Sequence, residues 1–106
     1  MTGFKEIEAN DLHSLMTDQR ITLVDVRNDD EVVRGIIPGA LHVPLALLPV
    51  KHDNLHGDET LVFYCHSGIR SAQAAAFLAA RGRDNVFNLI GGVLAWGKAG
   101  FPFERI

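Results

Sequence analysis

The chain has 106 residues, of which 47% are hydrophobic and 22% charged, and its formal net charge is −3. This composition is typical of a globular domain with one core and excludes a disordered chain. No basic stretch interleaved with aromatic residues is present, which disfavours a general nucleic-acid-binding surface, and no apolar run reaches the length of a membrane-spanning helix.

The first residues lack the basic-then-apolar pattern of a signal peptide, so we expect a cytoplasmic protein. Cys65 is the single cysteine, which rules out an internal disulfide. No linker, repeat or low-complexity segment divides the chain. We therefore expect one domain over residues 1–106.

Apolar and capping patterns predict alternating strands and helices along the chain. The predicted strands lie around residues 4–7, 22–26, 40–43, 60–64 and 86–89. Predicted helices cover 11–16, 31–34, 70–81 and the stretch after 91–92, with a helical turn at 45–49 and an irregular loop at 51–58. Asn10 and the polar residues 28–30 are expected to cap the first two helices. This alternation predicts an α/β domain with a mainly parallel sheet and helices on both faces.

The stretch from Leu61 to Ser71 joins a predicted buried strand to a predicted helix, and Cys65 lies in the loop between them. Ligands of parallel sheets gather beyond the carboxyl ends of the strands, which is where Cys65 is expected. The free N–H groups of a helix N-terminus, a loop curling inward at Gly68 and the charge of Arg70 all favour a thiolate. A lone cysteine is usually a buried hydrophobic residue, but this setting favours a reactive one.

Residues 64–71, with the sequence YCHSGIRS, resemble the active-site loop of the rhodanese (sulfurtransferase) family in its single-domain form. Two further segments are similar to motifs of that family: residues 25–40, which contain DVR and GIIPGA, and residues 91–102, which read GGVLAWGKAGFP. With these motifs in family order and spacing, the resemblance covers nearly the whole chain. It implies a rhodanese-like fold with five central strands.

The resemblance implies a sulfurtransferase that moves a sulfane sulfur through a persulfide on Cys65. The donor would be a small anion such as thiosulfate, and the acceptor would be cyanide in an assay and a thiol or another protein in the cell. A cysteine that is already ionised needs no general base, and spacing identifies no cysteine–histidine–acid arrangement. We expect no cofactor, no nucleic-acid partner and no membrane partner.

The backbone N–H groups of the loop are expected to hold the persulfide anion and to stabilise charge during transfer. The loop residues are His66, Ser67, Gly68, Ile69, Arg70 and Ser71. Arg70 is also expected to steer the anionic donor, and His66 to lie at the rim. Ser71 either caps the helix or hydrogen-bonds the substrate.

Other residues are expected to support the loop. Asp25 and Arg27 flank the end of a predicted core strand, and family resemblance implies a mostly structural role, with Arg27 to Glu31 as one candidate ion pair. Trp96 is expected in the core. The two glycines at 91 and 92 are expected to permit a tight strand-to-helix turn near the pocket.

Three other readings stay open at this point: a persulfide carrier that interacts with partner proteins, a cysteine phosphatase or arsenate reductase, and a binding domain without catalysis. Four residues separate Cys65 from Arg70, whereas related cysteine phosphatases have one more. A tighter loop suits the smaller terminal sulfur and favours sulfur transfer. The chain departs from the usual family pattern at Ile36, where many members have histidine, and at Val32, where an aromatic residue is common.

The five histidines raise the question of a metal site. His52 and His56 are four residues apart, but Asn54 and Gly57 weaken any helix that would align them. Because no second cysteine or carboxylate cluster stands at ligand spacing, we expect no metal.

Overall fold

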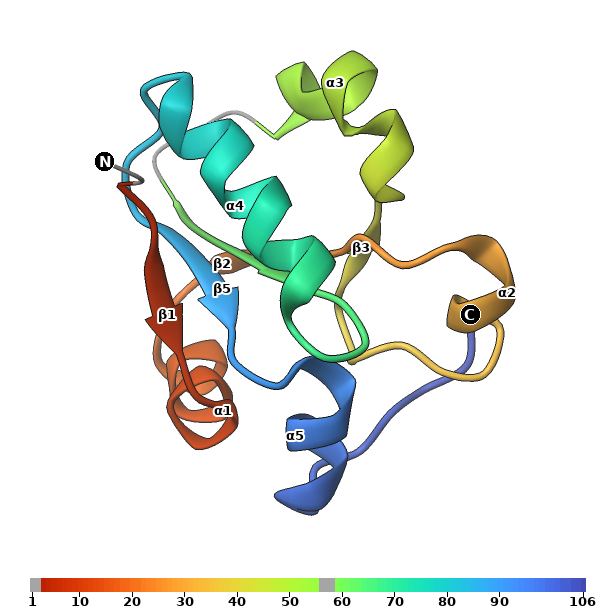
Figure 1. The fold of residues 1–106 in the computed structure, drawn as a ribbon. Helices are drawn as coiled ribbons and strands as arrows, with labels where there is room; N and C mark the ends of the chain where they lie inside the picture. The colour runs from red at the N-terminus through yellow and green to blue at the C-terminus, as the bar shows by residue number, and fades with distance from the viewer. Residues whose placement is uncertain (1–2, 56–58) are drawn as a thin grey trace.

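The computed structural model describes residues 3–55 and 59–106, and within these ranges five strands form one sheet. The strands are β1 (Lys5–Ile7), β2 (Ile21–Asp25), β3 (Leu41–His42), β4 (Thr60–Tyr64) and β5 (Val86–Leu89). Their order is β1-β5-β4-β2-β3, and every pairing among them is parallel (Figure 1). The predicted α/β class with a five-stranded sheet is confirmed.

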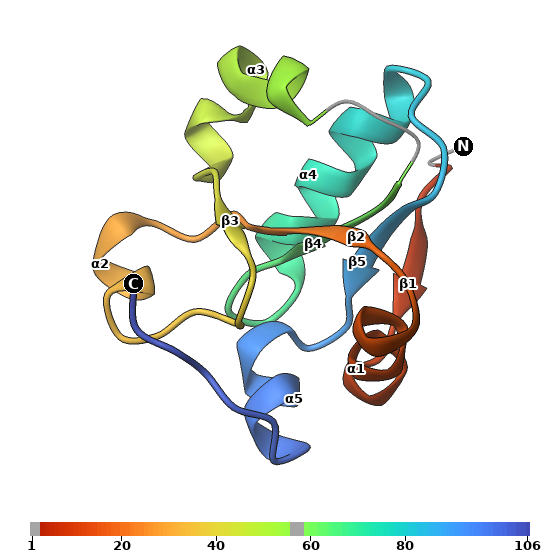
Figure 2. The same cartoon turned by 180° about the vertical axis from the view of Figure 1, so that it is seen from behind.

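Helices cover both faces of this sheet (Figures 1 and 2). One face carries α3 (Leu48–Lys51) and α4 (Ile69–Ala80), and the other carries α1 (Ala9–Asp18) and α5 (Gly92–Lys98). The short α2 (Asp29–Val32) follows β2, and two 3-10 turns, η1 (Leu45–Leu47) and η2 (His52–Asn54), flank α3. In the part of the chain that the structure describes, no helix is both long and apolar enough to span a bilayer.

Strand β4 lies at the centre of the sheet, and its side chains alternate between two cores. Leu61 and Phe63 pack in the cluster beneath α4, whereas Val62 and Tyr64 pack in the cluster beneath α1 and α5. A strand covered on both faces reads as a continuous apolar run, as this one does. Trp96 is buried in the second cluster, which confirms its predicted place in the core.

The N-terminal cap predicted for the first helix is wrong. Helix α1 begins at Ala9, and its N-cap is Glu8, without a side-chain cap. Asn10 lies inside the first turn, because the N–H of Leu12 bonds to the carbonyl of Glu8 at 2.9 Å and draws the helix start upstream. Burial of Ala9 and Leu12 against the sheet sets this start, and it outweighs the capping preference of asparagine.

Of the three polar residues predicted to cap the second helix, Asn28 is confirmed as its N-cap, whereas Asp29 and Asp30 lie inside α2, which begins two residues before the predicted start. Asn28 and Glu31 form a capping box, in which the backbone N–H of Asn28 donates to Oε1 of Glu31 at 3.0 Å. Glu31 is thereby held at the start of α2, with its side chain facing the loop after β4.

The irregular loop predicted for 51–58 is wrong where the structure describes it. Lys51 ends α3 and residues 52–54 form η2. Leu55 is buried in the core beneath α4, and this tertiary contact orders a segment that reads as polar in the sequence. Residues 56–58, which include His56, lie outside the described residues.

Candidate active site

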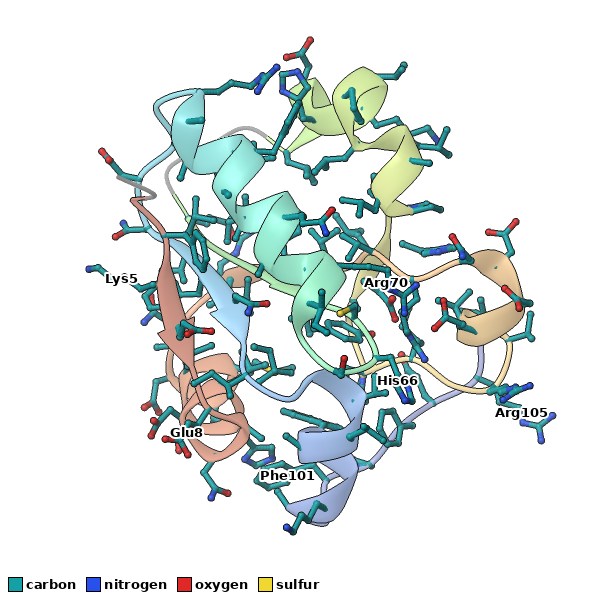
Figure 3. All side chains as sticks on the ribbon, viewed as in Figure 1. Lys5, Glu8, His66, Arg70, Phe101 and Arg105 are labelled. Atoms are coloured by element: carbon teal, nitrogen blue, oxygen red, sulfur yellow. The ribbon has the colours of Figure 1, made fainter. Side chains whose placement is uncertain are left out.

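Cys65 follows the carboxyl end of the central strand, where the loop turns into α4. Gly68 donates its backbone N–H to Sγ at 3.1 Å, and the Ser71 hydroxyl lies 3.4 Å from the same atom. The cysteine is only 1% exposed, because it packs in the apolar cluster beneath α4. Figure 3 shows His66 on this loop and Arg70 in the first turn of α4. The sulfur is therefore buried, yet hydrogen-bond donors face it.

The start of α5 holds the outer side of the loop. The N–H of Val93 donates to the carbonyl of Cys65 at 2.9 Å, and the N–H of Leu94 donates to the carbonyl of His66 at 3.3 Å. In a trans peptide the N–H points away from the carbonyl, and the described chain has no cis peptide. Holding these two carbonyls outward turns the N–H groups of residues 66 and 67 into the loop, as an anion cradle requires.

Gly92 makes this contact possible. A Cβ at this position would lie 2.3 Å from the carbonyl oxygen of Cys65 and 2.6 Å from that of His66, and the φ of Gly92 is +53°. Gly91, with φ +77°, is the N-cap of α5. The predicted tight turn into this helix is confirmed, and its second glycine also allows the helix to approach the loop.

The environment lowers the pKa of the Cys65 thiol below its ordinary value. Burial is the largest single influence and raises the pKa, because a thiolate loses hydration there. Hydrogen bonds to Sγ from the Ser71 side chain and from the backbone of Ser71, Gly68 and Ser67 favour the thiolate, and together they outweigh burial. Cys65 thus has the electrostatic setting of a nucleophile.

We expect the rate of Cys65 alkylation by iodoacetamide to rise with pH around a midpoint below that of an ordinary thiol, because only the thiolate reacts. The measurement is the second-order rate constant as a function of pH, with the protein unfolded in denaturant as the control. The unfolded chain should show an ordinary midpoint. An identical midpoint in the folded and unfolded protein would contradict the electrostatic role of the loop.

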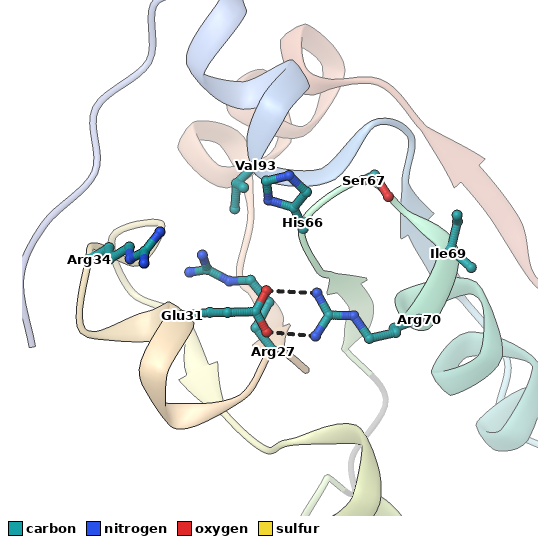
Figure 4. Close-up of a pocket in the computed structure, with 8 residues that line it drawn as sticks. All are labelled: Arg27, Glu31, Arg34, His66, Ser67, Ile69, Arg70 and Val93. Carbon is teal, nitrogen blue, oxygen red and sulfur yellow. Dashed lines mark hydrogen bonds and ion pairs between the residues drawn. The ribbon is translucent and has the colours of Figure 1, made fainter.

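Arg70 forms a bidentate ion pair with Glu31, and its charge also interacts with Cys65. Its Nη1 and Nη2 bond to the two carboxylate oxygens of Glu31 at 2.7 and 2.8 Å (Figure 4). The hydrogen bonds from Arg70 are the main cause that lowers the pKa of Glu31 to about 2, so this pair stays charged in mildly acidic solution. Its contribution to stability is present above the ordinary carboxyl pKa and is lost as the pH falls through about 2.

The predicted pairing of Arg27 with Glu31 is wrong. Arg27 instead binds Asp25, with Nε 3.0 Å from Oδ1 and Nη2 2.8 Å from Oδ2, and both residues are buried. Nη2 also donates to the carbonyl of Gly35 at 2.7 Å. This pair ties the end of β2 to the segment after α2. Its geometry fits the supporting role proposed for both residues.

A pocket of about 600 Å³ opens over the loop. Its lining residues are Arg27, Glu31, Arg34, His66, Ser67, Ile69, Arg70 and Val93 (Figure 4). Three guanidinium groups and one carboxylate line it, and two of the guanidinium groups already have carboxylate partners. Arg34 is exposed and makes no ion pair with any residue that the structure describes.

Ser71 does not cap the helix, since the N-cap of α4 is Gly68 in a left-handed conformation. The hydroxyl of Ser71 is buried between Sγ and Oδ1 of Asn88, which lies 2.5 Å away. Sequence reasoning missed Asn88. The available signal was a polar residue inside the apolar strand β5, which reads VFNL.

Of the residues that could bind a metal, no group of three or more is clustered within 3–55 and 59–106.

Comparisons with known proteins show the family to which the chain is similar. The family described as Rhodanese-like domain matches residues 8–99. A sulfurtransferase of Allochromatium vinosum is 40% identical over 98 residues, which make up 92% of each chain. The thiosulfate sulfurtransferase GlpE of Actinobacillus succinogenes is 33% identical over 102 residues, covering 96% of this chain and 92% of that protein.

Solved structures show the same likeness. The crystal structure of a rhodanese-like domain protein from Staphylococcus aureus aligns with a TM-score of 0.84 and 33% identity, covering 96% of this chain and 98% of the other. Both the sequence and the backbone are therefore similar over nearly the full length of these relatives.

Proposed function

Because the chain belongs to the family of rhodanese-like domains, we propose that it transfers a sulfane sulfur from thiosulfate to a thiophilic acceptor through a persulfide on Cys65. The observation that carries this proposal is the Cys65 sulfur at the centre of a loop whose donors face it, with Gly68 N at 3.1 Å. The relatives named as sulfurtransferases support the reaction class.

The first step is attack of the Cys65 thiolate on the outer sulfur of thiosulfate. The new bond joins Sγ to that sulfur, the S–S bond of thiosulfate breaks, and its electron pair leaves with sulfite. The negative charge now lies on the terminal sulfur of the persulfide, where the inward N–H groups of the loop stabilise it. No proton needs to move, which agrees with the absence of a basic partner on Sγ among the described residues.

In the second step the acceptor attacks the terminal sulfur of the persulfide. With cyanide as the acceptor, the carbon–sulfur bond of thiocyanate forms, the persulfide S–S bond breaks, and its electron pair returns to Sγ as the thiolate. The reaction is balanced without a cofactor, an oxidant or a reductant. A thiol of another molecule acts as acceptor in the same way.

The test is mass spectrometry of the intact protein after incubation with thiosulfate, followed by addition of cyanide. We expect one added sulfur atom, located on Cys65, that is lost as thiocyanate forms. Hydrolysis of an aryl phosphate that depends on Cys65, without any added sulfur, would instead indicate a phosphatase and would contradict the proposal.

Arg34 is the pocket cation proposed to attract the anionic donor, since the other two guanidinium groups bind carboxylates. Replacing Arg34 by glutamine should raise KM for thiosulfate about threefold to tenfold and leave kcat nearly unchanged, because long-range attraction acts on binding. The effect should shrink at high salt. Lys5→Gln, which removes a positive charge on β1 far from His66 and Arg70 (Figure 3), is the matched control. Equal changes of KM in the Arg34 and Lys5 variants would show that Arg34 has no special role in attracting thiosulfate to the pocket.

A persulfide carrier that delivers sulfur to another protein is the second candidate. It is favoured by an exposed apolar side chain at the pocket, since Ile69 lines the pocket and is 71% exposed. Fast transfer from the persulfide to a protein thiol, together with saturation only at very high thiosulfate concentration, would support this role over small-molecule turnover.

A further inference from the structure

Asn88 is a buried polar residue of β5 that the proposed mechanism does not use. It is 3% exposed, and both the oxygen and the nitrogen of its side-chain amide have hydrogen-bond partners. Nδ2 lies 3.2 Å from the carbonyl oxygen of Gly68 and 3.2 Å from Oε2 of Glu6, and Oδ1 accepts the hydroxyl of Ser71 at 2.5 Å. Two of these partners, Gly68 and Ser71, also contact the Cys65 sulfur.

These contacts leave one orientation for the Asn88 amide. The Gly68 carbonyl and the Glu6 carboxylate only accept hydrogen bonds, so both require the NH₂ group. With the amide turned over, its oxygen would face two other oxygens. Asn88 is therefore a fixed donor to the loop. Its Oδ1 competes with the Cys65 sulfur for the single hydroxyl proton of Ser71.

The contact between Asn88 and Gly68 affects the direction of a backbone N–H group, that of Ile69. The carbonyl of Gly68 accepts the first helical hydrogen bond of α4, from the N–H of Ala72, and a second one from Nδ2 of Asn88, at 3.2 Å in each case. The N–H of Ile69 belongs to the same trans peptide and points the opposite way, toward the open end of α4. Gly68 itself has φ +103°, and a Cβ on it would lie 3.3 Å from the backbone of residues 89 and 91.

We propose that Asn88 is a positioning residue for the anion cradle. Its NH₂ group helps to fix the direction of the Gly68 carbonyl and so keeps the Ile69 N–H turned toward the anion that the loop binds. The role of Asn88 in sulfur transfer rests on the proposed function, in which the anion bound by the loop is the sulfur donor or the persulfide. Asn88 has no contact with Sγ, so it acts through the Gly68 carbonyl and the Ser71 hydroxyl.

The test compares alkylation of Cys65 by iodoacetate, an anion, with alkylation by iodoacetamide, which is neutral. Both reagents attack the same thiolate, so the ratio of their rate constants is independent of the thiolate fraction and reports how well the cradle holds an anion. We expect the wild-type ratio to exceed that of glutathione. Asn88→Leu, which is similar in size and lacks the NH₂ donor, should lower the ratio about threefold or more, as for one weakened charge–dipole contact.

Asn88→Ala is the second variant if the leucine variant does not fold. Val86→Ala removes buried volume from the other end of β5 and controls for loss of stability. An unchanged ratio in the Asn88 variants, or an equal fall in Val86→Ala, would overturn the proposal. These readouts need no sulfur donor, so they remain informative if no persulfide forms. If the persulfide does form, kcat for transfer to cyanide should fall about tenfold in the Asn88 variants only.

Discussion

Replacing Cys65 by serine is expected to lower sulfur transfer from thiosulfate to cyanide by more than about a thousandfold, because it removes the nucleophile. A hydroxyl is far less acidic than a thiol, and the loop donors do not ionise it at neutral pH. The measurements are thiocyanate formation and the intact mass after incubation with thiosulfate. The near-ultraviolet circular dichroism should remain that of the wild type, because serine fits the space of Cys65. Thiocyanate formation by this variant at the wild-type rate would refute the persulfide mechanism.

Replacing Gly92 by alanine is expected to abolish most of the activity and also to destabilise the protein by about 2–4 kcal/mol. The new methyl group would lie 2.3 Å from the carbonyl oxygen of Cys65, and the backbone there has a positive φ. Either α5 or the loop must move, and the hydrogen bonds that hold the loop carbonyls outward are lost. Activity and the denaturant midpoint are the measurements.

Gly97→Ala provides the matched control for this variant. Gly97 lies in the same helix, and a Cβ on it would be 3.5 Å from the nearest described atom, on Phe103, with no positive φ. This substitution should leave activity unchanged and slightly stabilise the helix, by up to about 1 kcal/mol. Equal effects of the two substitutions would show that the approach of Gly92 to the loop does not matter.

Most of the fold could be predicted because it depends on local patterns. Strand β4 is a continuous apolar run followed by a helix-forming alanine-rich stretch, and both elements lie where the sequence predicted them. Asn28 caps α2 as predicted, since its interaction with Glu31 spans only three residues, although the part of Glu31 in this capping box was not predicted. The cap at Asn10 was predicted wrongly, because burial of the first turn of α1 is a tertiary effect.

The pairing of charges around the site could not be predicted in the same way. Arg70 and Glu31 are 39 residues apart, so their bidentate contact depends on how α2 and α4 meet at the carboxyl edge of the sheet. Arg27 had Glu31 as a neighbour four residues on, but it binds Asp25, two residues back, because both side chains enter the same buried space.

The sequence by itself determined the alternation of strands and helices, the parallel sheet and the place of Cys65 between a central strand and a helix. These follow from apolar periodicity, turn residues and helix propensity, which act over a few residues. Only the tertiary structure decided which donors face the sulfur and what holds them there. The start of α5 and Asn88 reach the loop from elements more than 15 residues further along the chain, and hydrogen bonds of this kind have no local pattern in the sequence.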